Sequence, residues 1–272
     1  MDLPVTVGVD TSEASLAAAD WAAREASLRG RPLRVLHALP PTAHPLPGRA
    51  AGQRSDGGGL LHEVQDVLAV RHPGVLLHTE EVHDVATSAL CAAAEDAELL
   101  VVGARGDGGF AGLRVGSTSL YLAARAGCPT VVLPVEPAGP EQRDQVVVGV
   151  DARRPAEAAL EFAFAAAARY GVVLRAVHAT AVAVAAGAAG GRDEEAGLLG
   201  RAIAPWRAAH PGVEVVEVTE RAAPGLLLVE ASAKASLLVV GRRPTVRIGL
   251  LGPVAHAVLH HAACPVAVVP DA

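Results

Sequence analysis

The chain has 272 residues, which is enough for two domains of typical size. Its residues are 51% hydrophobic, mostly Ala, Val and Leu, and only 3% aromatic, and this composition excludes a disordered chain. The net charge of −6 provides no general basic surface, so a nucleic acid is not the expected partner.

The first apolar segment predicts a strand at residues 5–9, and this strand ends in Asp10. Thr11 and Ser12 follow, and their hydroxyls offer an N-cap to the next element. That element is an Ala-rich helix, which is expected to close near Gly30.

A second strand is predicted at residues 33–36. Residues 40–59 are rich in Pro and Gly, show no apolar period and exceed the length of an ordinary connection. We expect them to form either a lid or an unstructured segment. A helix near 60–70, a strand near 75–80 and a helix near 85–95 come next.

The fourth strand, at residues 99–102, leads into a glycine-rich stretch at 103–119. A helix is expected to start at Ser117, and a last strand at 130–133 closes this half of the chain. Because strands and helices alternate throughout, the sequence predicts an α/β fold with a parallel, doubly wound sheet.

The pattern then starts again, which indicates a tandem duplication. Five short segments of the first half recur in the second half in the same order: 7–10 as 148–151, 36–38 as 177–179, 72–75 as 210–213, 99–103 as 237–241, and 128–129 as 264–265. We therefore expect one domain at 1–135, a Pro-containing linker at 136–144 and a second domain at 145–272.

The stretch at 103–119 has the features of a phosphate cradle. Its six glycines let a ligand approach the backbone closely. Ser117 and Thr118 stand where the helix begins, and free N–H groups there favour an anion. The alternative is a flexible glycine loop that binds nothing.

Two known phosphate loops fit this stretch poorly. The Walker pattern needs a Lys before the Ser/Thr, and none is present here. Residues 106–111 match a dinucleotide fingerprint that ends in Ala, but they follow the fourth strand instead of the first. No acidic residue stands near 131–132, where that fingerprint would need one.

Asp10 and Gly103 each end a strand. If those two strands are neighbours, both residues face one crevice at the carboxyl edge of the sheet. A carboxylate is poorly suited to bind phosphate, but it accepts a hydrogen bond from a ribose hydroxyl or an adenine amine. The alternative is that Asp10 only caps the helix that follows it.

Residues 248–270 carry no formal charge, and their length alone would allow a membrane span. Because Pro253 and Pro265 interrupt them, we expect a buried helix and a buried strand, and no membrane contact. His256 and His260 have the spacing of a helical metal pair. No Cys or acid completes a site locally, so no metal is expected.

The cysteines bear on the compartment. An odd, sparse set argues against a disulfide framework and fits a reducing environment: Cys91, Cys128 and Cys264. A secretory leader has a basic region followed by an apolar core, and the first residues do not show this pattern. We therefore expect a cytoplasmic protein with buried thiols.

The loop carries a resemblance. Gly103-x-x-Gly106, then nine residues, then Gly116-Ser117 resembles the ATP-binding signature of the universal stress protein family. Residues 7–10 and 35–37 are also similar to that family. The resemblance covers nearly the whole chain as two tandem domains, and it implies a strand order of 3-2-1-4-5 in each domain.

The resemblance also implies roles for single residues. Glycines would shape the loop, Ser117 and Thr118 would bind phosphate, and Asp10 would sit at the adenosine end beside the backbone near 36–37. Arg105 and Arg114 would either add charge to the phosphates or remain solvated. The residues expected at the nucleotide are Asp10, Gly103, Gly106, Gly108, Gly109, Arg114, Gly116, Ser117 and Thr118.

The second half departs from this signature. Pro244 replaces the second glycine and Pro253 replaces the serine, which removes a hydroxyl and an N–H donor. Only seven residues separate Pro244 from Gly252. We expect the first domain to bind ATP and the second not to bind it in the family manner. Its arginines at 242, 243 and 247 either hold another anion or are solvated.

The function expected first is an ATP-binding regulatory module in a stress response, with ATP bound alone or together with Mg²⁺. The resemblance implies pairing of such domains, and the chain would meet it either as a monomer, by pairing its own two domains, or as a homodimer. One alternative is a slow ATP hydrolase or an adenylate-forming enzyme, in which Asp107, the only acid of the loop, holds Mg²⁺. The other alternative is a scaffold that only dimerises. Fold analogy does not choose between them.

Overall fold

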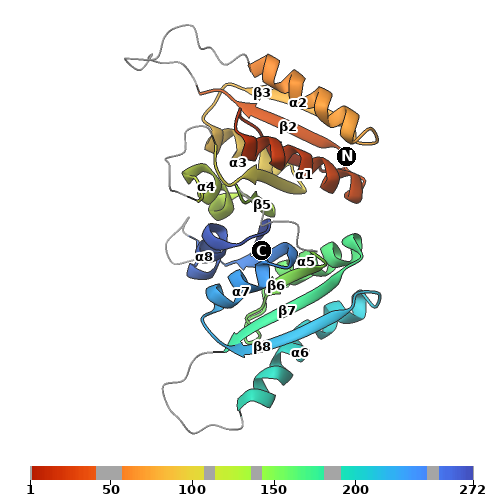
Figure 1. The fold of residues 1–272 in the computed structure, drawn as a ribbon, viewed down its shortest axis with the longest axis vertical. Helices are drawn as coiled ribbons and strands as arrows, with labels where there is room; N and C mark the ends of the chain where they lie inside the picture. The colour runs from red at the N-terminus through yellow and green to blue at the C-terminus, as the bar shows by residue number, and fades with distance from the viewer. Residues whose placement is uncertain are drawn as a thin grey trace. The chain divides into compact units, whose positions relative to one another are not determined.

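The computed structural model describes residues 2–40, 57–106, 114–135, 143–180, 191–243 and 251–271. They belong to two compact units, Met1–Val135 and Glu136–Ala272, drawn from red to green and from green to blue in Figure 1. Each unit has its own strand order and its own buried core.

The first unit alternates strands and helices: β1 (Val5–Gly8), α1 (Glu13–Arg29), β2 (Leu33–Ala38), α2 (Gly57–Arg71), β3 (Leu77–Val82), α3 (Ala86–Glu95), β4 (Leu99–Gly103), α4 (Ser117–Arg125) and β5 (Thr130–Leu133). Its strands are all parallel and lie in the order β3-β2-β1-β4-β5. The expected strand order of 3-2-1-4-5 is confirmed here.

The second unit repeats this arrangement: β6 (Gln145–Gly149), α5 (Glu157–Tyr170), β7 (Val173–Thr180), α6 (Gly191–Ala209), β8 (Val215–Arg221), α7 (Pro224–Ser232), β9 (Ala235–Arg242), α8 (Pro253–His261) and β10 (Val266–Pro270). Its parallel strands lie in the order β8-β7-β6-β9-β10. Each strand therefore has a counterpart in the first unit.

Two neighbouring strands of the first unit, β4 and β5, are buried on both faces. All the side chains of β4 and β5 are buried, as expected of a sheet that helices cover on both sides. Helix α1 lies close to the sheet through a stripe of small residues with at most 1% exposure: Ala18, Ala19, Ala22, Ala23 and Ala26. Strands β3 and β8, each at one end of its unit's strand order, by contrast keep all their side chains exposed or half-exposed.

Helix α1 begins and ends where its capping residues predict. The Ser12 hydroxyl accepts a hydrogen bond from the Ser15 N–H at 3.2 Å, which satisfies one of the free donors of the first turn. Gly30 ends the helix in the left-handed region with φ of 63°, where a side chain would be strained. Gly171 ends α5 in the same way, with φ of 65°.

Three expected boundaries are wrong by a few residues. Helix α2 begins at Gly57, so the segment expected as a lid or unstructured at 40–59 is shorter, and residues 41–56 lie outside the described residues. Strand β3 begins at Leu77 instead of 75, because the Val75 N–H donates to His72 O at 3.0 Å in a turn. Strand β2 runs to Ala38, two residues beyond the expected end at 36.

The uncharged residues 248–270 form no long helix over their described part. Helix α8 occupies Pro253–His261 and strand β10 occupies Val266–Pro270, which confirms the expected helix followed by a strand. None of the helices over the described residues combines the length and the apolar character that crossing a bilayer requires.

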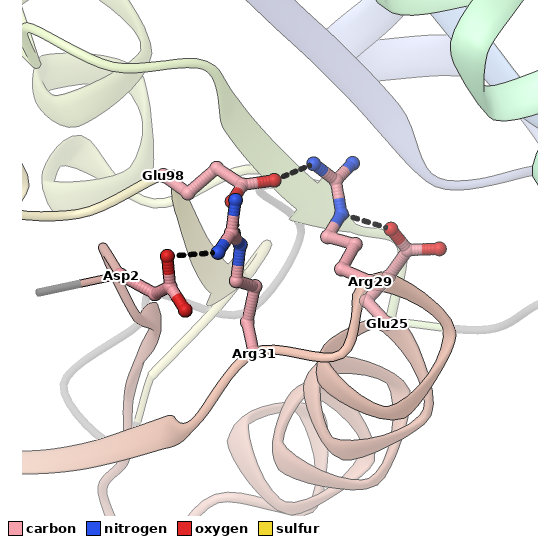
Figure 2. A network of polar contacts seen from close by, with 5 residues as sticks. All are labelled: Asp2, Glu25, Arg29, Arg31 and Glu98. Atoms are coloured by element: carbon pink, nitrogen blue, oxygen red, sulfur yellow. Dashed lines mark hydrogen bonds and ion pairs between the residues drawn. The ribbon is translucent and has the colours of Figure 1, made fainter.

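A network of charged side chains joins the end of α1 to the start of β4 (Figure 2). Arg29 contacts two carboxylates at 2.8 Å, with Nε on Glu25 and Nη1 on Glu98. Arg31 contacts the same Glu98 at 2.5 Å and Asp2 at 2.7 Å. The Glu25 side chain is fully buried and that of Arg29 is 6% exposed, so this pair is shielded from water.

Glu98 is the branch point of the network. Burial works to raise the pKa of its carboxyl, but hydrogen bonds and positive charge from Arg29 and Arg31 outweigh burial and hold that pKa below its ordinary value. Glu98 is therefore ionised at neutral pH, and it binds the C-terminal end of α1 to the segment that leads into β4.

Candidate functional site

The first unit brings Asp10 and the start of the glycine-rich stretch together. Strand β1 pairs with β4, with Val5 opposite Leu99 and Val7 opposite Val101, so their carboxyl ends lie at one edge of the sheet. Asp10 stands two residues beyond β1, and Gly103 is the last residue of β4. A Cβ atom on Gly106 would overlap Oδ2 of Asp10, so the backbone of Gly106 lies against the carboxylate.

The Asp10 carboxylate is fixed by Ser12. Its Oδ1 accepts hydrogen bonds from the Ser12 N–H at 3.0 Å and from the Ser12 hydroxyl at 2.5 Å. The same hydroxyl lies 3.3 Å from Arg105 O, so Ser12 also contacts the loop after β4. The N-cap of α1 is Ser12, and the alternative in which the Asp10 side chain fills that role is wrong.

The start of α4 is attached to the end of β4. The Gly116 N–H donates to Ala104 O at 2.7 Å, and the buried Ser119 hydroxyl donates to Gly103 O at the same distance. Helix α4 has no side-chain hydrogen bond at its N-cap. Ser117 is exposed and Thr118 is half-exposed, so their hydroxyls lie at the surface of this edge.

Ser119 is a residue that the sequence alone did not single out. It is the third hydroxyl of the run Ser117-Thr118-Ser119, and no local pattern separates it from the other two. Two positions along a helix correspond to a rotation of about 200°, so Ser119 points to the opposite side from Ser117. The run therefore combines an anchoring hydroxyl with two exposed ones.

The three glycines of the signature that the structure describes differ in what surrounds them. At Gly116, a Cβ would lie 3.5 Å from Ala104 O, an ordinary contact, and the backbone has extended angles that any residue adopts. At Gly103, a Cβ would lie 2.8 Å from the carbonyl carbon and oxygen of Ala14 in α1. The fold itself thus requires glycine at Gly103 and does not require it at Gly116.

We expect Gly103→Ala to lower the free energy of unfolding by about 1–3 kcal/mol, because the added methyl group forces α1 away from β4. Urea denaturation followed by circular dichroism measures this change. Gly127→Ala is the matched control, since a Cβ at Gly127 meets no atom within 4 Å. Equal unfolding midpoints for the two variants would contradict this interpretation of Gly103.

His37, near the end of β2, is buried and has a defined tautomer. Its Nδ1 lies 2.8 Å from Val9 O, and a carbonyl oxygen only accepts, so Nδ1 carries the proton. Nε2 is then an acceptor, and it is buried without a hydrogen-bond partner among the described residues. The sequence predicts only that the backbone near 36–37 borders the adenosine, and it gives the His37 side chain no role.

Of the other predicted site residues, the structure describes only Arg114. Its side chain is exposed, and it stands three residues before Ser117, the first residue of α4. Gly108 and Gly109 lie outside the described residues, as does Asp107. Over the part of the chain that the structure describes, no group of three His, Cys, Asp or Glu side chains is placed to hold a metal.

No disulfide joins the three cysteines. Cys128 and Cys264 are buried and Cys91 is half-buried, so the expectation of three buried thiols is correct for two of them. Burial raises the pKa of the Cys264 thiol to about 12, because a thiolate is poorly stabilised away from water. Cys264 is therefore a protonated, apolar side chain at neutral pH.

The second unit has a cavity of about 990 Å³ at the corresponding edge, where strands β6, β7, β8 and β9 end. Here Asp151 takes the place of Asp10, but its carboxylate forms an ion pair with Arg243 at 3.0 Å. Partial burial works to raise the pKa of Asp151, and hydrogen bonds from Arg243 and the Arg153 N–H outweigh it and hold that pKa below its ordinary value. Asp151 is therefore an anion with a fixed cationic partner.

Helix α8 of the second unit begins with proline. Its N-cap is Gly252, with φ of −63° and ψ of 160°, close to the angles of Gly116. Pro253 is the first helical residue, so the N–H and the hydroxyl that Ser117 supplies in the first unit are both missing. Pro244, the other departure from the signature, lies outside the described residues.

Comparisons with known proteins agree along the chain. A sequence model of the universal stress protein family matches residues 3–134 and again 142–270. Universal stress protein Rv2623 of Mycobacterium tuberculosis is 35% identical over 260 residues, which cover 89% of this chain and 86% of that protein. A universal stress protein of Mycolicibacterium smegmatis is 34% identical over 286 residues, which cover 97% of this chain and 96% of that protein.

A solved structure that spans nearly the whole chain shows the same fold. The universal stress protein of Archaeoglobus fulgidus covers 99% of this chain and 98% of its own, with a TM-score of 0.71 at 17% identity. A universal stress protein solved in complex with cAMP covers 48% of this chain and 95% of its own, with a TM-score of 0.39 at 26% identity.

Proposed function

The chain belongs to the universal stress protein family, and we propose that it is an ATP-binding regulatory module of the stress response whose first unit holds the nucleotide. The observation that carries this proposal is the start of α4, a nine-residue helix without a side-chain cap whose first residues, Ser117 and Thr118, are accessible. The free N–H groups and the helix dipole attract an anion there, and the two hydroxyls add donors. The phosphates are assigned to this end of α4.

Gly116 supports this assignment. Neither its backbone angles nor its described neighbours require glycine, since a Cβ would meet only ordinary contacts. The missing side chain leaves the N–H groups of the first turn open to a phosphate. A side chain at this position would occupy the space that the phosphate needs.

Two groups suit the adenosine part of the ligand. Both Ser12 hydrogen bonds to Asp10 go to Oδ1, while Oδ2 faces Gly106, and a carboxylate oxygen accepts from a ribose hydroxyl. His37 carries a buried acceptor nitrogen near the end of the neighbouring strand β2. An adenine amine or a ribose hydroxyl is the type of donor that these acceptors would bind.

The proposed ligand is ATP, alone or with Mg²⁺ on its phosphates. The residues proposed to contact it or to shape its site are Asp10, Gly103, Gly106, Gly108, Gly109, Arg114, Gly116, Ser117 and Thr118. The first unit, residues 1–135, is proposed as the domain with a working loop, followed by a linker at 136–144 and a domain at 145–272 with a degenerate loop. Pro253 supports that difference, because it removes two donors from the start of α8.

Regulation requires that ATP bind two states of the protein with different affinity. The stretch at 103–119 is the element that would change, since the nucleotide would join its glycines to the start of α4. An occupied loop and an empty loop would then present different surfaces to a partner. We propose no catalytic residue for this chain.

Calorimetric titration of nucleotide-stripped protein with ATP and Mg²⁺ tests the proposal. We expect about one ATP per chain, because only the first unit keeps the donors at its helix start. A stoichiometry of about two would show that Pro253 does not prevent binding in the second unit. No heat, together with an unshifted melting temperature, would contradict the proposal and favour the scaffold.

The compartment and the assembly belong to the same proposal. No disulfide joins the three cysteines, which fits a reducing compartment, so we propose the cytoplasm. The family resemblance implies pairing of two such domains, within one chain or in a homodimer, and light scattering on the sample used for calorimetry distinguishes the two by mass. The stoichiometry per chain is then read together with the number of chains per particle.

A further inference from the structure

We propose that the second unit binds a ligand of another class: an organic anion that carries one oxyanion group, such as a carboxylate or a phosphate, on an apolar body. Arg153 and Arg242 recognise the anionic group in the cavity at the carboxyl ends of β6 to β9. The inference concerns a different cavity from the proposed ATP site, and it does not depend on whether the first unit binds ATP.

The cavity has the size and the walls of a small-molecule site. Its volume of about 990 Å³ lies at the upper end of the range typical of such pockets. One part of its wall is apolar and includes Leu228 of α7, Val240 of β9, and Val254 and Ala255 of α8. Such a wall binds the hydrophobic body of a ligand and excludes water around its charged end.

The charged residues of the wall favour an anion. Four arginines line the cavity against two carboxylates, Asp151 and Glu220, which leaves an excess of two positive charges. Arg243 forms an ion pair with Asp151 at 3.0 Å, so this carboxylate is already neutralised inside the wall. We assign the ligand's oxyanion to Arg153 and Arg242. Guanidinium groups bind planar or phosphate-like oxyanions through paired N–H donors.

A comparison of equivalent positions shows how the second unit differs. Arg153 stands where the first unit has Ser12, and Arg242 stands where it has the buried Ala104. In the opposite sense, Pro253 and Val254 stand where it has Ser117 and Thr118. At these positions the second unit therefore has hydrogen-bond donors on two arginine side chains, whereas the start of its helix α8 is apolar.

This exchange selects against a triphosphate. An extended, highly charged chain of phosphates needs many donors, including the N–H groups and hydroxyls that α8 has lost at Pro253 and Val254. A compact oxyanion needs only the two arginines, and its apolar body gains from contact with Leu228, Val240 and Val254. The second unit is therefore a separate binding site whose ligand differs from that of the first unit.

The test uses two fluorescent probes with the same apolar body. 8-Anilinonaphthalene-1-sulfonate carries an oxyanion, and N-phenyl-1-naphthylamine is its neutral analogue. Both are titrated into the full chain with saturating Mg²⁺-ATP present. We expect about one sulfonate probe bound per chain, with no displacement by ATP. Displacement of the probe by ATP would overturn the inference, because the cavity would then be a nucleotide site.

The variants separate anion recognition from general hydrophobic binding. Arg153→Ser with Arg242→Ala installs the residues of the first unit. We expect this double variant to lower the affinity for the sulfonate probe at least about tenfold and to leave the affinity for the neutral probe unchanged. Arg201→Ala, on α6 and outside the cavity wall, is the matched control and should change neither probe. An equal affinity of the double variant and the wild type for the sulfonate probe would overturn the inference. An equal loss of affinity for both probes in the double variant would also overturn the inference.

Arg153→Ser alone guards against a folding defect, because Arg153 is exposed and its N–H contact with Asp151 comes from the backbone. A partial loss of affinity for the sulfonate probe in this variant, at an unchanged melting temperature, supports the inference. An unchanged affinity for that probe in a folded Arg153→Ser variant contradicts the role of this arginine. ATP calorimetry on the same samples reports separately on the first unit.

Discussion

Gly116→Val combined with Ser117→Ala is expected to weaken ATP binding at least about 100-fold while the chain stays folded. The valine side chain would fill the space beside the first turn of α4, and the alanine removes a hydroxyl donor. A hydrogen bond to a charged group contributes about 1.5–3 kcal/mol. Its loss together with the steric block corresponds to about 2.7 kcal/mol, or two powers of ten in affinity.

The fold should tolerate this double variant, because Gly116 has extended backbone angles and a Cβ added there would meet only ordinary contacts. Replacing a glycine N-cap costs at most about 1 kcal/mol. Calorimetry measures the affinity, and circular dichroism checks the fold. Gly252→Val at the equivalent position of the second unit is the matched control and should leave ATP binding unchanged. Unchanged ATP affinity in the folded double variant would refute the assignment of the phosphates to α4.

Arg29→Met is expected to lower the free energy of unfolding by about 3–5 kcal/mol. It leaves Glu25, whose side chain is fully buried, without the guanidinium that lies 2.8 Å away. A buried charge that has lost its partner costs far more than the pair contributes in net terms. Guanidinium chloride denaturation at neutral pH measures the difference.

The double variant Glu25→Met with Arg29→Met is the control, because it removes both members of the pair. We expect it to recover most of the lost stability, since well-packed apolar side chains replace a buried ion pair with little or no net cost. Glu98 keeps Arg31 as a partner in this variant. If the double variant were as unstable as Arg29→Met, packing rather than charge would explain the effect.

The pH dependence of stability gives a second measure of the same network. The pKa of Glu98 is lower in the folded chain than its ordinary value of 4.5, so the folded state binds its proton less readily than the unfolded state. Its contribution to stability is present above that value and is lost as the pH falls through the lowered one. The stability of Glu98→Gln should therefore fall less steeply than that of the wild type as the sample is acidified below pH 4.5.

Much of the fold can be predicted from the sequence, because its signals are local and repeated. The apolar strands at 5–9 and 99–102, each followed by a polar or glycine-rich turn, indicate the carboxyl edge where Asp10 and Gly103 lie. The recurrence of the same order in the second half indicates the duplication. The strand order itself came from the family resemblance, and the structure confirms it in the first unit.

The parts that could not be predicted depend on contacts distant in the sequence. Arg29 and Glu98 are 69 residues apart, and no local pattern connects them. Ser119 and Ser117 are the same residue type on one helix, and only the packing of α4 against β4 makes one an anchor. The ion pair of Asp151 with Arg243 likewise joins residues 92 positions apart, so an Asp that repeats at the end of a strand gave no sign of it.

Strands β3 and β8, each at one end of its unit's strand order, have a consequence for how separate chains meet. Each end strand of a sheet presents unpaired N–H and C=O groups that another strand could join, which is a route to aggregation. Glu80 and Glu81 stand on β3, and Glu217 and Glu220 stand on β8. Two chains that approached through β3 would bring the exposed carboxylates of Glu80 and Glu81 close together, whereas on β8 the carboxylate of Glu217 already pairs with Arg207 at 2.8 Å. Like-charge repulsion therefore disfavours edge-to-edge pairing of chains through β3.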